Sequence, residues 1–96
     1  MTRITKETKS GMEDWLRITL NTMFRRDAMS IDPSRTEDER AKDTHIADDE
    51  RGNLRGFQDA LHLLGYDYRF ETEMRVSATG CEYPNVTSVR IVPISK

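Results

Sequence analysis

The stretch "RGNLRGFQDALHLLGYDYRFETEMRV" (residues 51–76) contains the change of pattern that decides the fold. Its first half repeats apolar residues at spacings of three, four and three, the period of an amphipathic helix: Leu54, Phe57, Leu61 and Leu64. Gly65 then supplies the left-handed cap that often ends a helix. After it the apolar period becomes two, from Tyr68 to Ala78, which is typical of a half-buried strand. The stretch therefore predicts a helix followed by an antiparallel strand.

Toward the N-terminus, a second apolar stripe predicts another helix over residues 11–28. The stripe consists of Met12, Trp15, Leu16, Leu20, Met23 and Phe24. Ser10 followed by Glu13 has the spacing of a capping box, and Ser34 followed by Glu37 repeats it before the next helix. We expect residues 1–9 to form a flexible tail, with a short edge strand as the alternative, and residues 10–96 to form a single domain. Residues 35–50 are almost entirely charged, so either an exposed helix or partial disorder fits them.

Toward the C-terminus, the loop "TGCEYPN" (residues 79–85) precedes a second strand through Val86, Val89 and Ile91. Pro93 belongs at the end of that strand because proline cannot donate to the ladder. The sequence thus predicts an α+β fold of two helices and a β-hairpin (α-α-β-β). A two-stranded hairpin is marginally stable by itself. We therefore expect the sheet to be completed by the N-terminus or by dimerisation, and a homodimer also suits the low hydrophobic content of 35%.

The two apolar stripes and one face of the first strand should together form one core. Its predicted members are Trp15, Leu16, Leu20, Phe24, Phe57, Leu61, Leu64, Tyr68, Phe70, Met74 and Val76.

Two glycines inside the second helix need an explanation, because glycine in a helix interior costs about 1 kcal/mol relative to alanine. Gly52, Gly56 and Ala60 repeat every four residues and so lie on one face. Small residues allow two helix axes to approach closely. We therefore predict helix packing at this face, against the first helix or against the same helix of a second copy. The alternative is that the glycines break the helix near residue 52.

The residues that could support catalysis or metal binding are few. Cys81 is the single cysteine, which excludes an intrachain disulfide, and nothing places His45 or His62 near it as a base. His45 and Asp49 have helical metal-ligand spacing, but two ligands are too few for a zinc site. We predict no catalytic, cofactor-binding or metal-binding residues and no enzymatic activity.

Charge and hydropathy limit the partners. The net charge is −2, so no global basic field attracts nucleic acid, and we expect no direct nucleic-acid binding. No apolar run approaches the roughly 20 residues of a membrane span. The N-terminus also lacks the apolar stretch of a secretion signal. We expect a soluble cytoplasmic protein with no membrane contact.

Two acidic clusters and two arginines are the candidate partner-binding residues. The clusters are Glu37–Asp38–Glu39 and Asp48–Asp49–Glu50, and both could engage a basic surface on a target. Arg51 and Arg55 lie four residues apart and could flank a phosphate at a dimer seam. The alternative for all of them is a solvated helix face with intramolecular ion pairs.

The layout of the chain resembles a known group of proteins. A short acidic chain with a charged first half, followed by "RGFQDALHLLGYDYRFE" (residues 55–71), is similar to small accessory proteins encoded by phages and prophages, including anti-CRISPR and other anti-defence proteins. This resemblance implies a non-enzymatic inhibitor that binds stoichiometrically to a nucleic-acid-targeting effector in the host cytoplasm. The alternative function is an oligomeric protein that sequesters a small ligand or nucleotide through arginines at a subunit seam.

Overall fold

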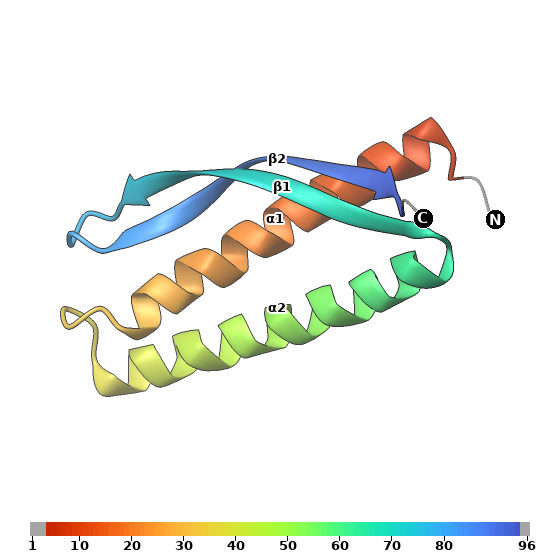
Figure 1. The fold of residues 1–96 in the computed structure, drawn as a ribbon. Helices are drawn as coiled ribbons and strands as arrows, with labels where there is room; N and C mark the ends of the chain where they lie inside the picture. Colours follow the sequence, from red (N-terminus) through yellow and green to blue (C-terminus); the bar gives the residue numbers. More distant parts are fainter. Residues whose placement is uncertain (1–3, 95–96) are drawn as a thin grey trace.

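The computed structural model describes residues 4–94 as two long helices followed by a β-hairpin (Figure 1). The elements are α1 (Lys6–Ser30), α2 (Glu37–Leu63), β1 (Tyr66–Val76) and β2 (Glu82–Pro93). The two strands pair antiparallel in a two-stranded sheet. The predicted α-α-β-β order is confirmed. Because α2 is continuous from Glu37, residues 37–50 are helical and the glycines cause no break.

Both helices begin at residues other than those predicted. Thr5 caps α1 by accepting a hydrogen bond from the Thr8 N–H, so residues 6–9, predicted as tail, are helical. Residues 1–3 lie outside the described part. The predicted Ser10 capping box is wrong, since Ser10 lies inside α1. The capping box of α2 uses Thr36 with Glu39, not Ser34 with Glu37. Residues 4–9 add no strand to the sheet.

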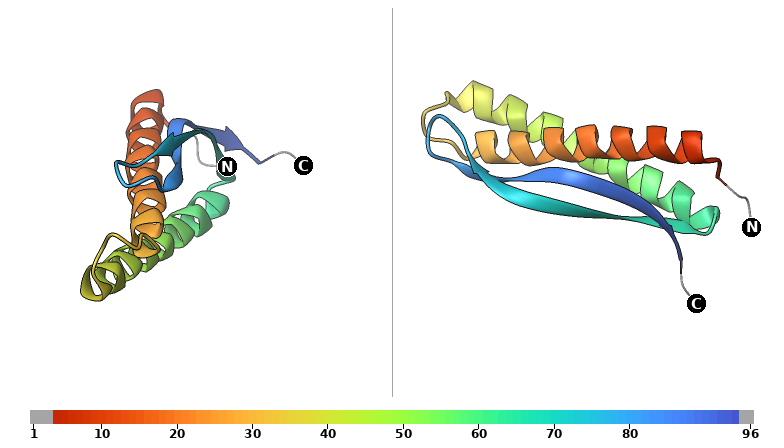
Figure 2. Two further views of the ribbon diagram at one scale, coloured as in Figure 1. Left: turned by 90° about the vertical axis from the view of Figure 1, so that its left-hand side faces the viewer. Right: turned by 90° about the horizontal axis from the view of Figure 1, so that it is seen from above.

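Helix α1 lies between the other elements, with α2 packed on one side and β2 on another. The second helix and the hairpin meet at the turn that joins them and diverge toward the opposite end of the molecule (Figures 1 and 2). The core lies along α1, where seven buried side chains form one cluster: Leu16, Leu20, Met23, Leu54, Leu61, Val86 and Ile91. Neither helix, within residues 4–94, combines the length and apolar content needed to cross a membrane.

The backbone of β2 is bonded to α1 by side chains. Asn21 accepts a hydrogen bond from the Val86 N–H at 2.6 Å and donates one to the Val86 carbonyl at 3.2 Å. Glu13 accepts a hydrogen bond from the Ile91 N–H at 2.7 Å. The ladder shifts register beside Val86, leaving Thr87 without a partner residue on β1. These bonds cover the edge of β2 that faces away from β1.

The predicted core is only partly correct. Leu16, Leu20 and Leu61 are buried, but the side chains of Met74 and Val76 are 62% and 63% exposed. Trp15 and Phe70 are also exposed, although Trp15 packs against Phe57 with ring centroids 4.9 Å apart. The remaining predicted members are half-buried: Phe24, Phe57, Leu64 and Tyr68. The reason is that α1 covers β2, so β1 extends beyond the helices that should bury it.

The two glycines of the stripe pack against no residue between 4 and 94. A Cβ atom built at Gly52 or Gly56 would have no neighbour within 4 Å, and Ala60 is exposed. The prediction that α1 packs closely against these residues is therefore wrong. The alternative neighbour, a second copy of α2, stays a prediction.

A buried carboxylate joins both helices and the loop between them. Asp43 on α2 is fully buried and accepts hydrogen bonds from Arg26 on α1 at 2.9 Å and from Arg35 in the loop at 2.6 Å. Burial alone would raise the pKa of Asp43, but the bonds from the two arginines outweigh it and hold the pKa below its ordinary value.

We predict that Asp43→Ala lowers the free energy of unfolding by about 3 kcal/mol, since two arginines then lose a buried partner. Asp48→Ala is the control, because Asp48 pairs with Arg51 at the surface and exposed pairs contribute less than about 1 kcal/mol. Urea titration of both variants provides the measurement. Equal losses in the two variants would contradict the structural role of Asp43.

We predict that Gly56→Ala raises the stability of the monomer by about 1 kcal/mol, because alanine favours the helix and meets no neighbour. Thermal unfolding at low protein concentration measures the change. A loss of stability would show that another surface does approach Gly56 closely.

Candidate functional site

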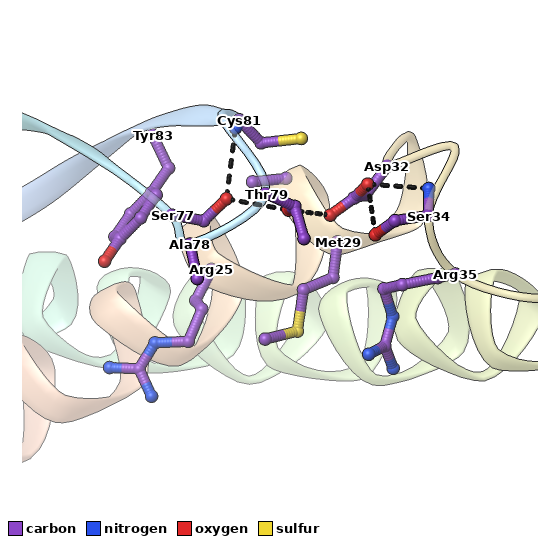
Figure 3. Close-up of a pocket in the computed structure, with 11 residues that line it drawn as sticks. Arg25, Met29, Asp32, Ser34, Arg35, Ser77, Ala78, Thr79, Cys81 and Tyr83 are labelled. Atoms are coloured by element: carbon purple, nitrogen blue, oxygen red, sulfur yellow. Dashed lines mark hydrogen bonds between the residues drawn. The ribbon is translucent and has the colours of Figure 1, made fainter.

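A pocket lies where the loop between the helices meets the loop of the hairpin (Figure 3). We call it the tip pocket. It has a volume of about 360 Å³. Ala28, Met29, Ala78 and Tyr83 form its apolar walls, and its polar lining comes from Arg25, Asp32, Ser34, Arg35, Ser77, Thr79 and Cys81. The pocket therefore suits a mainly apolar group that carries one polar or charged atom.

Asp32 connects the two loops that form the tip pocket. Its side chain is only 5% exposed. It accepts hydrogen bonds from the Ser34 N–H at 2.9 Å, from the Ser34 hydroxyl at 2.8 Å, and from the Thr79 hydroxyl of the hairpin loop. These bonds, with Thr79 the strongest, lower the pKa of Asp32 to about 2. Asp32 is therefore a fixed anion that holds the pocket together.

The tip pocket contains a thiol but no histidine. Cys81 is half-buried in the wall, and its N–H donates to the Ser77 hydroxyl at 3.0 Å. A cysteine nucleophile needs a neighbouring base. His45 and His62 both lie on α2 and line no part of this pocket. No histidine therefore lies beside the thiol in the lining of this pocket.

His45 and Asp49, whose spacing would suit two metal ligands, gain no third donor among residues 4–94. His45 and Asp49 lie on one face of α2 with their nearest atoms 3.6 Å apart. Within residues 4–94, no three histidine, cysteine or acidic side chains gather in a way that could hold a metal ion.

The two predicted acidic clusters differ in how many of their carboxylates are available. In the second, Asp48 pairs with Arg51 at 2.7 Å, Asp49 faces His45, and Glu50 accepts a weak hydrogen bond from Asn53. In the first, Glu39 is used by the capping box. Glu37 and Asp38 are exposed and form no ion pair with any residue between 4 and 94. These two acids follow Arg35, which lines the tip pocket, by two and three residues, so they lie at the same end of the molecule as the pocket.

The structure brings Arg51 and Arg55 to a second depression, which we call the α2–β1 groove. The groove has a volume of about 290 Å³ and is lined by Leu20, Met23, Phe24, Arg51, Leu54, Arg55, Gln58, Tyr68 and Phe70. Arg51 is already bonded to Asp27 at 2.7 Å as well as to Asp48. Arg55 has no ion pair within the described residues. Only one of the two predicted arginines is therefore free to meet a ligand.

Sequence reasoning missed the tip pocket. Its key bond joins Asp32 to Thr79, which is 47 residues away in the chain. In the sequence Asp32 is visible only as the residue before Pro33, which signals a turn and no partner. No local spacing could have identified it.

We predict that Asp32→Asn destabilises the protein at pH 7 and that this difference from the wild type disappears as the pH falls. The pKa of Asp32 is lowered from 3.8 to about 2 in the folded chain, so its charged form stabilises the fold above pH 4. That contribution is lost as the pH falls through about 2, where the wild type also becomes neutral. Urea unfolding of both proteins at pH 7, 4 and 2 tests this. A difference in the free energy of unfolding that stays constant with pH would contradict the prediction.

Comparisons with known proteins give no match. No family model, no curated protein and no solved structure matches the chain. No functional residue can be transferred from another protein, and the resemblance to phage accessory proteins stays a prediction.

Proposed function

We propose that the protein is a small non-enzymatic binding module that acts by stoichiometric contact with a target protein. The observation that supports this best is the combination, at one end of the molecule, of the tip pocket with unpaired surface acids. The pocket offers an apolar recess for a side chain of the target. Glu37 and Asp38 offer negative charge that no described residue neutralises. Apolar anchoring beside complementary charge is how protein interfaces combine affinity with orientation.

The charge of this end defines the target class that we propose. Glu37, Asp38 and Glu39 form the first turn of α2, and acids there are stabilised by the positive end of the helix dipole. A negative end of this kind complements a basic groove, such as the nucleic-acid channel of an effector. Occupying that channel would block nucleic-acid binding, which is the anti-CRISPR-like inhibition that the layout of the sequence suggests.

The alternative function, sequestering a small ligand or nucleotide through arginines at a subunit seam, has weaker support. It relies on Arg51 and Arg55, and the first of these is held by Asp27 and Asp48. Calorimetric titration with ATP separates the two functions, because the binding module should show no heat from nucleotide binding.

We predict that Glu37→Lys/Asp38→Lys abolishes target capture, since it reverses the unpaired charge beside the tip pocket. Ala78→Trp should also abolish it by filling the pocket from an exposed loop position. Asp14→Lys/Asp59→Lys is the matched control: both acids are exposed, Asp14 has only a 3.9 Å contact with Arg17, and Asp59 has no ion pair within residues 4–94. The experiment is a pull-down from the lysate of the native host, with captured proteins identified by mass spectrometry.

The expected result is a basic, nucleic-acid-binding protein that the wild type and the control capture and that both tip variants lose. Far-ultraviolet circular dichroism must show that all variants are folded. Equal capture by the control and the tip variants would contradict the proposed surface. Absence of any captured protein, together with heat from ATP binding, would favour the alternative.

A further inference from the structure

The outer edge of β1 is open. Val86 and Ile91 direct their backbone N–H groups away from β1, because Asn21 and Glu13 bond to them. Residues directly opposite each other in an antiparallel ladder point their backbone groups the same way, toward or away from the partner strand. Thr72 and Tyr68 on β1 lie opposite Val86 and Ile91, so their backbone N–H and C=O groups also point away from β2. Because the direction alternates along a strand, the backbone groups of Phe70 and Met74 point away from β2 as well.

Most of this edge is free to pair. The Tyr68 N–H is already taken by the Asp67 carboxylate at 2.8 Å, so the free part begins at Phe70. Among residues 4–94 no third strand lies beside β1. An exposed strand edge of this length is a template for pairing with another chain unless it is protected.

The charges on β1 are arranged so that the strand complements itself. The side chains that alternate with Phe70 and Met74 along β1 are charged: Asp67, Arg69, Glu71, Glu73 and Arg75. Within the single chain, Asp67 already bonds to Gln58 and His62 of α2, and Glu73 bonds to Arg75. If two copies pair antiparallel about Glu71, Arg69 of each lies opposite Glu73 of the other, and Asp67 lies opposite Arg75. Shifting the centre by one residue, to Phe70 or Thr72, brings acid opposite acid. Cross-strand pairs of opposite charge stabilise a sheet, and like charges destabilise it.

We propose that two copies of the chain pair through their β1 edges, antiparallel and centred on Glu71, to form a four-stranded sheet. In this register Phe70 lies opposite Thr72 of the second copy, and both belong to the set whose backbone groups point outward. The hydrogen bonds between Phe70 and Thr72 therefore fall on the free part of the edge, and pairing of Tyr68 with Met74 would replace the bond from the Tyr68 N–H to Asp67. Only the two Glu71 side chains are placed unfavourably, at the symmetry axis.

An unexplained pair of arginines supports this arrangement. Arg69 and Arg90 lie directly opposite each other on β1 and β2, are exposed, and have no acidic partner within the described residues. Like charges in that position destabilise a hairpin. Glu73 of the second copy would lie on the other side of Arg69 and compensate this repulsion.

The apolar residues of β1 find cover in the same register. Met74 of the second copy lies opposite Tyr68, next to the α2–β1 groove, whose walls include Tyr68 and Phe70. Met74 is 62% exposed and Phe70 is 40% exposed in the single chain. The helix-facing side of the added strand would therefore bury side chains that α1 leaves uncovered. This surface is separate from the tip pocket, so the proposal does not depend on the proposed function.

Charge exchange across the interface tests the proposal. Arg69→Glu should weaken the dimer at least about tenfold, because it places acid opposite Glu73 in both symmetry-related pairs. The hairpin itself should remain folded, since the new acid faces Arg90. Arg69→Glu/Glu73→Arg should restore the dimer by exchanging the charges. Arg90→Glu is the control, with the same change of charge on the strand that lies away from the interface.

Sedimentation equilibrium over a dilution series measures the dissociation constant of each variant. We expect similar dissociation constants for the wild type, the double variant and Arg90→Glu, and a higher dissociation constant for Arg69→Glu alone. A wild type that is monomeric at the highest concentration would overturn the proposal. Equal weakening by Arg69→Glu and Arg90→Glu, or no rescue by the double variant, would overturn the register.

Discussion

The side chains of Asn21 and Glu13 attach the outer edge of β2 to α1, and the rest of the architecture follows from this one-sided attachment. Backbone groups of a strand edge must find partners or water. Here α1 supplies those partners to Val86 and Ile91, so β2 joins the core that α1 forms with α2. Because one helix is too narrow to cover two strands that are also twisted, β1 remains only partly covered. The same bonds that bury β2 thus leave β1 as the open side of the sheet.

This asymmetry gives the molecule two surfaces with different properties. The tip pocket is polar-rimmed and held by Asp32, and at the same end lie Glu37 and Asp38, which form no ion pair with residues 4–94. The β1 edge combines free backbone groups, exposed apolar side chains and alternating charge. A dimer through β1 would leave both tip pockets free, and each target would meet its own copy. Self-association and target binding are therefore compatible in one assembly.

The features that depend on local sequence could be predicted, and those that depend on distant contacts could not. The change of period at Gly65 correctly located the end of α2 and the start of β1, because it reflects backbone geometry within a few residues. The capping box of α2 was misplaced because Thr36 and Glu39 have the same spacing as Ser34 and Glu37, and spacing alone does not rank two such pairs. Burial of Met74 was predicted from its alternation with polar neighbours, which identifies a face but not whether a helix covers it.

The candidate sites divide in the same way. The acidic residues of α2 were identified from composition, but which of them are neutralised depends on Arg51 and Arg35, whose directions only the fold reveals. The glycine stripe was correctly recognised as one face, yet that face points to solvent. The tip pocket depends on the contact between Asp32 and Thr79, and no spacing along the chain could have indicated it.

A disulfide at the symmetry axis would report whether two β1 strands pair about Glu71. Opposed residues of a non-hydrogen-bonded antiparallel pair have Cα atoms about 4.5 Å apart, which lies within the range that a disulfide spans. In a Cys81→Ser background, Glu71→Cys should therefore oxidise to a disulfide-linked dimer, whereas Glu73→Cys should not link to itself, as its two copies lie several residues apart. Non-reducing electrophoresis after mild oxidation reports both. A linked Glu73→Cys protein with an unlinked Glu71→Cys protein would contradict the register, and failure of both variants to link would contradict the pairing.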